Sequence, residues 1–136
     1  MAEKNYGHRD IVDKLSIRPG YAVVFACEAM EIDVALRERI IDRAGRPPAL
    51  EDQSIDVVLV STDAATDFIE VLKRWRLRLK PNGAIWLLTP KRGQPGYVDQ
   101  RELIAAGLQA GVVDNKGCSV SLTTSAMRFV IRKRDR

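Results

Sequence analysis

Residues 72–90, LKRWRLRLKPNGAIWLLTP, constrain the fold more than any other stretch of the chain. Apolar side chains recur at helical spacing through its first half and just before it, at Phe68, Val71, Leu72, Trp75 and Leu79. Pro81-Asn82-Gly83 then predicts a turn, and the apolar run at 84–88 predicts a buried strand. An amphipathic helix followed closely by such a strand is typical of an open α/β sheet.

The remaining segments extend this pattern. Apolar runs, helical periodicity and capping residues predict a short helix at 11–15, strands at 21–26 and 56–60, helices at 31–44 and from Asp99 to Gly111, and a hairpin with strands at 119–122 and 127–132 around a turn at 123–125. Ser61, Thr62 and Asp63 could each cap the helix that follows them. We therefore expect a three-layer α/β fold whose open sheet is mostly parallel, with a C-terminal antiparallel hairpin.

Length and composition bound the class of protein. The 136 residues suit one domain, 1–136, in which we expect residues 1–10 and 133–136 to be flexible. The chain has no apolar run long enough to span a membrane, and its polar start predicts a cytoplasmic location. Cys27 and Cys118 belong to no metal-binding pattern, so we expect no metal site and two reduced, buried thiols.

The charge is unevenly distributed along the chain. Residues 1–68 hold 8 Lys/Arg and 13 Asp/Glu, whereas residues 69–136 hold 14 Lys/Arg and 5 Asp/Glu. This asymmetry leaves open an anionic partner such as nucleic acid or an acidic protein, or a homo-oligomer joined through acidic and basic faces. A solvated surface with basic helix ends is the alternative.

Three local matches make the chain resemble a shortened S-adenosylmethionine-dependent methyltransferase fold. They are the lead-in at 15–20 before the first strand, the turn at 79–84, which is similar to that family's "LKPGG", and Ala110-Gly111-Val112 before the hairpin. The segment from Leu88 to Val98, with the Pro-Gly lead-in, further resembles a family of small bacterial proteins of unknown function. That resemblance supports the fold and implies no activity.

One departure from the methyltransferase pattern concerns the cofactor. That family ends its first strand with an acidic residue and a Gly-x-Gly-x-Gly loop, whereas this chain has Cys27-Glu28-Ala29-Met30 there and no glycine between Gly20 and Gly45. Only about ten residues separate Gly45 from the strand at 56–60, so two strands of the family sheet should be absent. We therefore expect a degenerate cofactor site and no bound cofactor, with S-adenosylmethionine as the disfavoured alternative.

Candidate site residues follow from the expected topology, because ligands of open α/β sheets bind beyond the carboxyl ends of the strands. The candidates are Glu28, Thr62, Asp63, Thr89, Lys91 and Arg92. Lys91 and Arg92 could hold an anionic ligand, while Asp63 or Glu28 could bind hydroxyl groups; structural roles as a cap or a solvated surface are the alternatives. Trp75 and Trp86 lie in apolar runs, which predicts core positions.

No catalytic residues are expected, so the sequence favours a non-catalytic ligand-binding or interaction module. The alternatives are a small-molecule methyltransferase and an electrostatic binder of nucleic acid or acidic protein. The single histidine, His8, makes a histidine-based catalytic pair a weak hypothesis.

Overall fold

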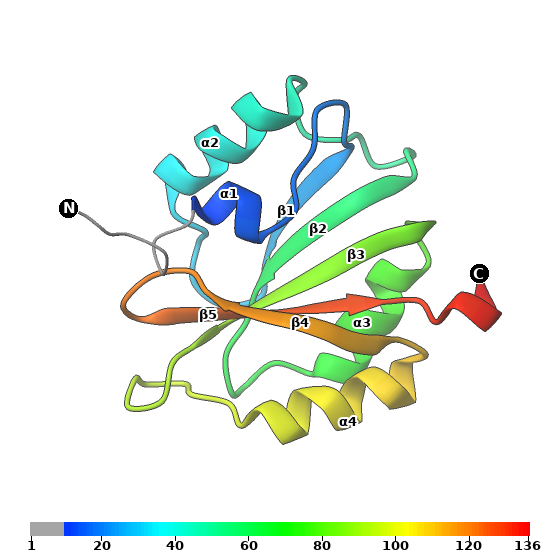
Figure 1. Cartoon of the computed structure of the whole chain (residues 1–136). Helices are drawn as coiled ribbons and strands as arrows, with labels where there is room; N and C mark the ends of the chain where they lie inside the picture. The colour runs from blue at the N-terminus through cyan, green and yellow to red at the C-terminus, as the bar shows by residue number, and fades with distance from the viewer. Residues whose placement is uncertain (1–9) are drawn as a thin grey trace.

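The computed structural model describes residues 10–136, and it confirms the expected α/β class (Figure 1). The elements in chain order are α1 (Ile11–Lys14), β1 (Val23–Cys27), α2 (Val34–Ala44), β2 (Ile55–Ser61), α3 (Phe68–Arg76), β3 (Leu79–Pro90), α4 (Gln100–Ala110), β4 (Val113–Ser119), β5 (Thr124–Val130) and the 3-10 helix η2 (Lys133–Asp135). His8 and the other residues before position 10 lie outside this description.

The sheet has five strands in the order β1-β2-β3-β5-β4. Strands β1, β2 and β3 are parallel, and β5 and β4 add to β3 as an antiparallel hairpin. β1 therefore forms one edge of the sheet, and no strand or helix occupies residues 45–54. This confirms the expected loss of two strands from the longer sheet.

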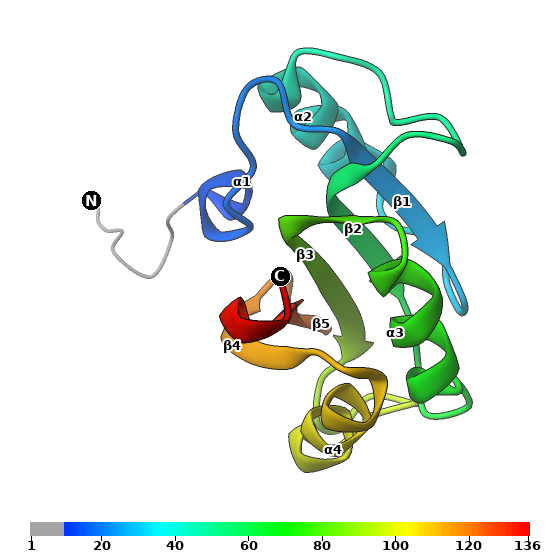
Figure 2. The ribbon, with the colours of Figure 1, turned by 90° about the vertical axis from the view of Figure 1, so that its right-hand side faces the viewer.

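Helices cover both faces of the sheet and produce two cores (Figure 2). One core joins α3 and α4 to residues such as Val58, Ile85 and Phe129, and the other joins α1 and α2 to residues such as Leu59 and Trp86. Successive residues of a strand point to opposite faces, so strands buried on both sides must be apolar throughout. Both tryptophans are core residues, as predicted.

The boundary between α3 and β3 differs from the expectation. α3 ends at Arg76, so Leu79 opens β3 and is not part of the helix. Pro81-Asn82-Gly83 does not end an element; it is an irregularity inside β3, where the pairing with β2 shifts from Leu79 to Ala84. Gly83 is required because a Cβ there would lie 3.0 Å from two carbonyl oxygens of β2.

Several predicted boundaries and caps were also wrong. Asp67 caps α3, and the predicted caps Ser61, Thr62 and Asp63 lie before it; α2 starts at Val34 after its cap Asp33. The hairpin turn is at 120–123, so of the predicted strand at 119–122 only Ser119 lies in a strand, at the end of β4, and 124–125 belong to β5. The prediction failed because β4 is polar at most positions and exposed, so it lacks an apolar pattern. Asp99 and Gly111 cap α4 as expected.

The two cysteines differ in their exposure to solvent. Cys27 is exposed, contrary to the expected burial, because β1 is an edge strand that ends there; Cys118 is half-buried.

Residues 133–135 form η2, with an ion pair of 3.2 Å between Arg132 and Asp135. Among the residues from 10 onward, no helix has the length and apolarity needed to cross a membrane.

Candidate functional site

A cavity of about 310 Å³ lies beyond the carboxyl ends of β2 and β3, on the face of the sheet that α1 and α2 cover. Its walls come from the β1–α2 connection, the start of α2, the ends of β2 and β3, and the β4–β5 turn. The apolar part of the wall is formed by Ile11, Ala29, Met30, Ile32, Leu36, Leu88, Pro90, Pro95 and Val120. The site thus combines segments that are far apart in the sequence around a mostly apolar space.

Three of the predicted site residues line this cavity: Thr62, Asp63 and Thr89. The Thr62 hydroxyl donates a hydrogen bond of 2.9 Å to the Leu88 carbonyl, which ties β2 to β3. The Asp63 carboxylate accepts a hydrogen bond of 2.9 Å from the Ala65 N–H. These bonds fix both side chains at the strand ends, where they can offer polar atoms to a ligand.

The rim of the cavity carries both signs of charge. Glu31, Asp33 and Asp63 lie on it together with Arg39. Arg39 forms an ion pair of 2.5 Å with Asp10, whose pKa is lowered by a hydrogen bond from the Val12 N–H and by the nearby Arg39. Asp33 accepts the Leu36 N–H at the start of α2.

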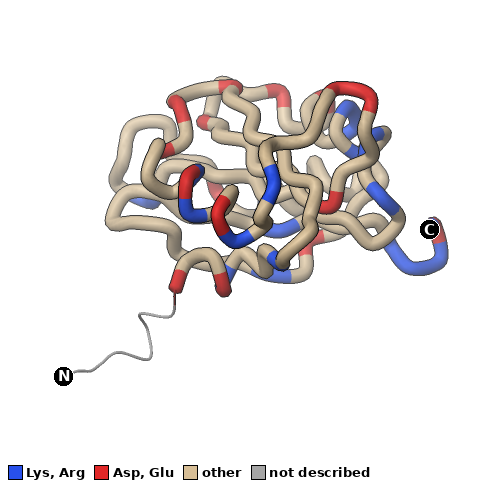
Figure 3. The backbone as a smooth tube through the Cα atoms, turned by 90° about the horizontal axis from the view of Figure 1, so that it is seen from above, with Lys and Arg blue, Asp and Glu red and all other residues tan. Residues whose placement is uncertain are grey.

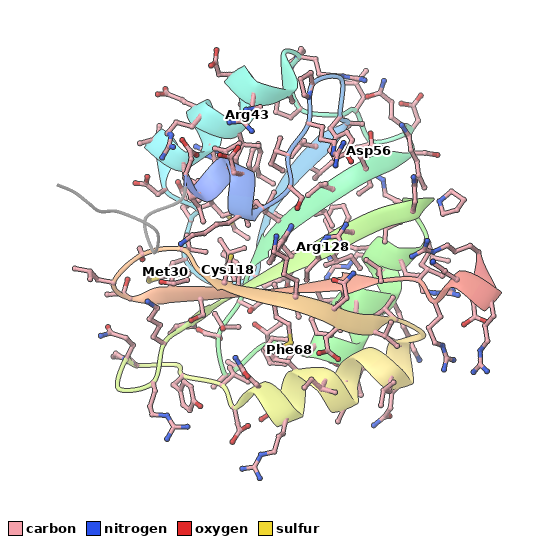
Figure 4. The ribbon with its side chains drawn as sticks, in the orientation of Figure 1. Met30, Arg43, Asp56, Phe68, Cys118 and Arg128 are labelled. Atoms are coloured by element: carbon pink, nitrogen blue, oxygen red, sulfur yellow. The ribbon has the colours of Figure 1, made fainter. Side chains whose placement is uncertain are left out.

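The connection between β1 and α2 is hydrogen-bonded to the end of β2. The Glu28 N–H donates to the Ser61 carbonyl at 2.8 Å, and the Ser61 hydroxyl donates to the Met30 carbonyl. Residues 27–33 all have negative φ, since Ser16 is the one described non-glycine residue with a positive value. Met30 lies toward the left of the molecule, where Figure 4 labels it. Its backbone carbonyl is thus held while its side chain is exposed.

Glu28 lies outside the cavity. Its carboxylate accepts a hydrogen bond of 3.2 Å from Arg74, which also forms an ion pair of 2.9 Å with Glu70 one helical turn away. The hydrogen bond from Arg74 to Glu70, followed by the interaction with Glu28, raises the pKa of Arg74. Glu28 therefore anchors the end of β1 to α3, a structural role that the sequence left open.

Lys91 and Arg92 line a second cavity of about 350 Å³ on the opposite face of the sheet. Loop 91–98, the first turn of α4 and the start of β5 enclose it. Thr89 borders both cavities. The structure thus divides the predicted residues between two sites and places Glu28 in neither.

Sequence reasoning placed the segments 27–30 and 61–63 at this end of the sheet without selecting Met30 or Ser61 as site residues, and it missed Arg39 and the β4–β5 turn. Arg39 and the hairpin turn are far from the strand ends in sequence, and only the packing of α2 and β5 brings them there. Ser61 offered a signal, because it ends an apolar strand directly before Thr62 and Asp63.

The basic cluster around α3 is largely engaged within the protein. Arg74 binds Glu70 and Glu28, Arg76 donates to the Gly111 carbonyl, Arg78 donates to the Leu50 and Gln53 carbonyls, and Lys80 pairs with Asp56. Figure 3 shows further Lys and Arg positions around the C-terminus. The cluster therefore has structural partners that the sequence alone did not reveal.

Comparisons with known proteins place the chain in a group without an assigned activity. A family described as a protein of unknown function, DUF3052, matches residues 12–133. The uncharacterized proteins Rv2239c of Mycobacterium tuberculosis and Mb2263c of Mycobacterium bovis are each 36% identical over 80 residues, covering 58% of this chain and 50% of theirs. The chain thus spans about half the length of the curated relatives it matches.

Solved methyltransferases share the fold at low sequence identity. The mitomycin 7-O-methyltransferase MmcR superposes with a TM-score of 0.61 at 12% identity, covering 83% of this chain and 50% of that protein. NcsB1, an O-methyltransferase from neocarzinostatin biosynthesis solved with S-adenosylmethionine, gives 0.62 at 13% identity, with 90% and 52% covered. A methyltransferase from Aquifex aeolicus gives 0.55 at 11% identity, with 90% and 88% covered.

Proposed function

The chain belongs to this DUF3052 family of unknown function, and from that premise we propose that it is a non-catalytic small-molecule-binding module of methyltransferase-like fold. The proposed ligand occupies the 310 Å³ cavity, with its apolar part against the wall and its polar part near Thr62 and Asp63. We further propose that the cofactor site of the fold is degenerate, that the protein acts without S-adenosylmethionine, and that it is cytoplasmic.

The observation that carries the proposal is the closed β1–α2 connection. In the fold family, glycines let a cofactor approach the backbone at this turn. Here every residue of the turn has a side chain. The Glu28 N–H donates a hydrogen bond to the Ser61 carbonyl, and the Met30 carbonyl accepts one from the Ser61 hydroxyl. The neighbouring strand that would hold the ribose is missing as well, since β1 is the sheet edge. The residues present do not fit the cofactor in that mode.

The cavity supports the binding part of the proposal. Small-molecule sites are typically concave, mostly apolar and marked by a few fixed polar groups, with volumes of about 300–1,000 Å³. The cavity has these properties, and its polar residues are held by hydrogen bonds to neighbouring backbone.

Titration calorimetry with S-adenosylmethionine tests the cofactor part. We expect no binding tighter than about 1 mM, which corresponds to about 4 kcal/mol of binding free energy. Micromolar binding would instead support the alternative of a small-molecule methyltransferase and would refute the degenerate site.

Ligand-observed NMR with 1-hexanol tests the cavity itself. We expect saturation transfer to hexanol in the wild-type protein and its loss in Ala35→Trp, because Ala35 lines the cavity from α2. Ala105→Trp, at an exposed position of α4, is the matched control and should retain the signal. An equal signal in both variants, or none in the wild type, would show that the cavity is not the binding site.

Electrostatic binding of nucleic acid is the weaker alternative, because most of the basic cluster around α3 already has protein partners. A labelled-DNA shift assay at low salt separates it from the main proposal, since phosphate contacts make binding strongly salt-dependent.

A further inference from the structure

The second cavity, of about 350 Å³, is lined mainly by polar groups. Thr89, Lys91, Arg92, Tyr97, Asp99, Gln100 and Ser125 contribute to it, with Val98, Leu103 and Met127 as its apolar part. It lies on the α4 side of the sheet, whereas the cavity of the proposed function lies on the α2 side. The two cavities can therefore be tested separately.

Two cations in this cavity are held by neutral partners. The Lys91 ammonium donates to the Ser119 hydroxyl at 2.6 Å. The Arg92 guanidinium lies 5.5 Å from the centre of the Tyr97 ring and 3.4 Å from its hydroxyl. Neither cation forms an ion pair within residues 10–136, so both retain charge that an anion could neutralise.

Asp99, the one carboxylate that residues 10–136 contribute to the cavity wall, already has protein partners. It pairs with Arg101 at 3.0 Å and accepts the Arg101 N–H at 2.8 Å as the cap of α4. The hydrogen bond from the Arg101 side chain, then that from its N–H, holds the pKa of Asp99 at about 2, and Arg92 adds to this effect. Since Arg101 balances Asp99, the cavity has an excess of positive charge.

The hydroxyl groups of Thr89 and Ser125 face the same space. Thr89 is only 6% exposed, and its side chain points to the α4 side because Ile85 and Leu87, at alternate positions of the strand, lie in the α3–α4 core. Ser125 is opposite Thr89 in the β3–β5 register. Within the described part of the chain, neither hydroxyl forms a side-chain hydrogen bond. Thr89 is buried and Ser125 is half-buried, and both line the cavity, so both hydroxyls can donate hydrogen bonds to a ligand there.

We propose that this cavity binds a phosphate group, with Lys91 and Arg92 neutralising its charge and the Thr89 and Ser125 hydroxyls donating to its oxygens. Charge-assisted hydrogen bonds from lysine and arginine are the usual means of holding such groups. The cavity is much larger than a phosphate ion, and Val98, Leu103 and Met127 offer an apolar wall. The ligand class is therefore a phosphomonoester of a small organic molecule.

Thermal unfolding in the presence of inorganic phosphate or phenyl phosphate tests this proposal, with sodium chloride at the same ionic strength as the reference. At a tenfold excess over Kd, we expect a rise in Tm of about 5 °C. Stronger stabilisation by phenyl phosphate identifies a phosphomonoester, and equal stabilisation at equal concentration identifies free phosphate as the source. No rise beyond that given by chloride overturns the proposal.

The double variant Lys91→Ala/Arg92→Ala should lose the phosphate-dependent rise. Lys73→Ala/Arg134→Ala removes the same charge from exposed positions outside the cavity and should keep it. If the two variants respond equally, the rise reflects net charge and the site is refuted. Hexanol binding in the first cavity should persist in both variants, so failure here is separable from failure of the proposed function.

Discussion

At the scale of single residues, the two tryptophans show how similar sequence contexts lead to different energetics. Trp86 is fully buried, and its indole N–H donates a hydrogen bond of 3.1 Å to the Leu15 carbonyl, which fastens the end of α1 to β3. Trp75 is 9% exposed, and its indole nitrogen is buried without a partner in the described structure. Its ring lies under the Arg78 guanidinium.

Replacing each tryptophan by phenylalanine should separate these roles. Trp86→Phe removes a buried donor and leaves the Leu15 carbonyl unpaired, whereas Trp75→Phe removes a donor that had no partner. We expect Trp86→Phe to lower the unfolding free energy by about 1–3 kcal/mol more than Trp75→Phe does. Urea denaturation measures both values, and equal losses would contradict the role given to the Trp86 hydrogen bond.

The cysteines should differ in reactivity. Cys27 is exposed, while burial raises the pKa of the Cys118 thiol despite the nearby Lys14 and Lys116. A raised pKa leaves less thiolate near neutral pH, and thiolate is the reactive form. With a thiol reagent at pH 8, we expect Cys27→Ser to show only slow labelling and Cys118→Ser to keep the fast phase. Fast labelling of Cys118 would mean that β4 does not shield it.

At the scale of elements, the packing of α4 on β5 depends on a close approach. Gly107 lies in the middle of α4, and a Cβ there would be 2.7 Å from the Phe129 ring. Phe129 is fully buried in the α3–α4 core, so its ring has little room to move. Gly83 is likewise a position without room for a Cβ, but there the neighbouring atoms belong to the backbone of β2 and not to a side chain.

Gly107→Ala should therefore destabilise the protein, although alanine ordinarily favours a helix interior by about 1 kcal/mol. We expect a net loss of about 1–3 kcal/mol in the unfolding free energy, as for other overpacked cores. The exposed Leu108→Ala in the same helix is the control and should change stability by about 0.5 kcal/mol or less. A stabilising Gly107→Ala in thermal or urea denaturation would show that Phe129 can move aside.

At the scale of the whole molecule, the sequence predicted the layers and the topology well. The apolar runs of β1, β2 and β3 and the helical spacing of α3 are strong local signals, and the short segment after Gly45 correctly predicted the shortened sheet. The predicted boundaries of helices and strands were wrong where they depend on pairing with residues distant in the sequence. Leu79 continues the helical spacing of α3 but pairs with Ile55 in the sheet, and polar β4 is defined by its partner β5.

The candidate site was predictable only in part, for a related reason. Residues directly after apolar strands, such as Thr62 and Asp63, could be identified because topology brings strand ends together. Sequence could not show that Glu28 turns toward Arg74, or that Thr89 lies between two cavities. Those facts depend on side-chain directions that only the packed sheet determines.

The position of β1 has a consequence for self-association. An edge strand offers free backbone groups to strands of other chains, which promotes aggregation. Val23 directs its carbonyl away from β2, and the Ala49 N–H satisfies it at 2.9 Å. Pro47 and Pro48 come just before Ala49 and have no N–H with which to extend a ladder. The segment between α2 and β2, which stands where the longer sheet has two more strands, thus covers part of the β1 edge and hinders its pairing with another chain.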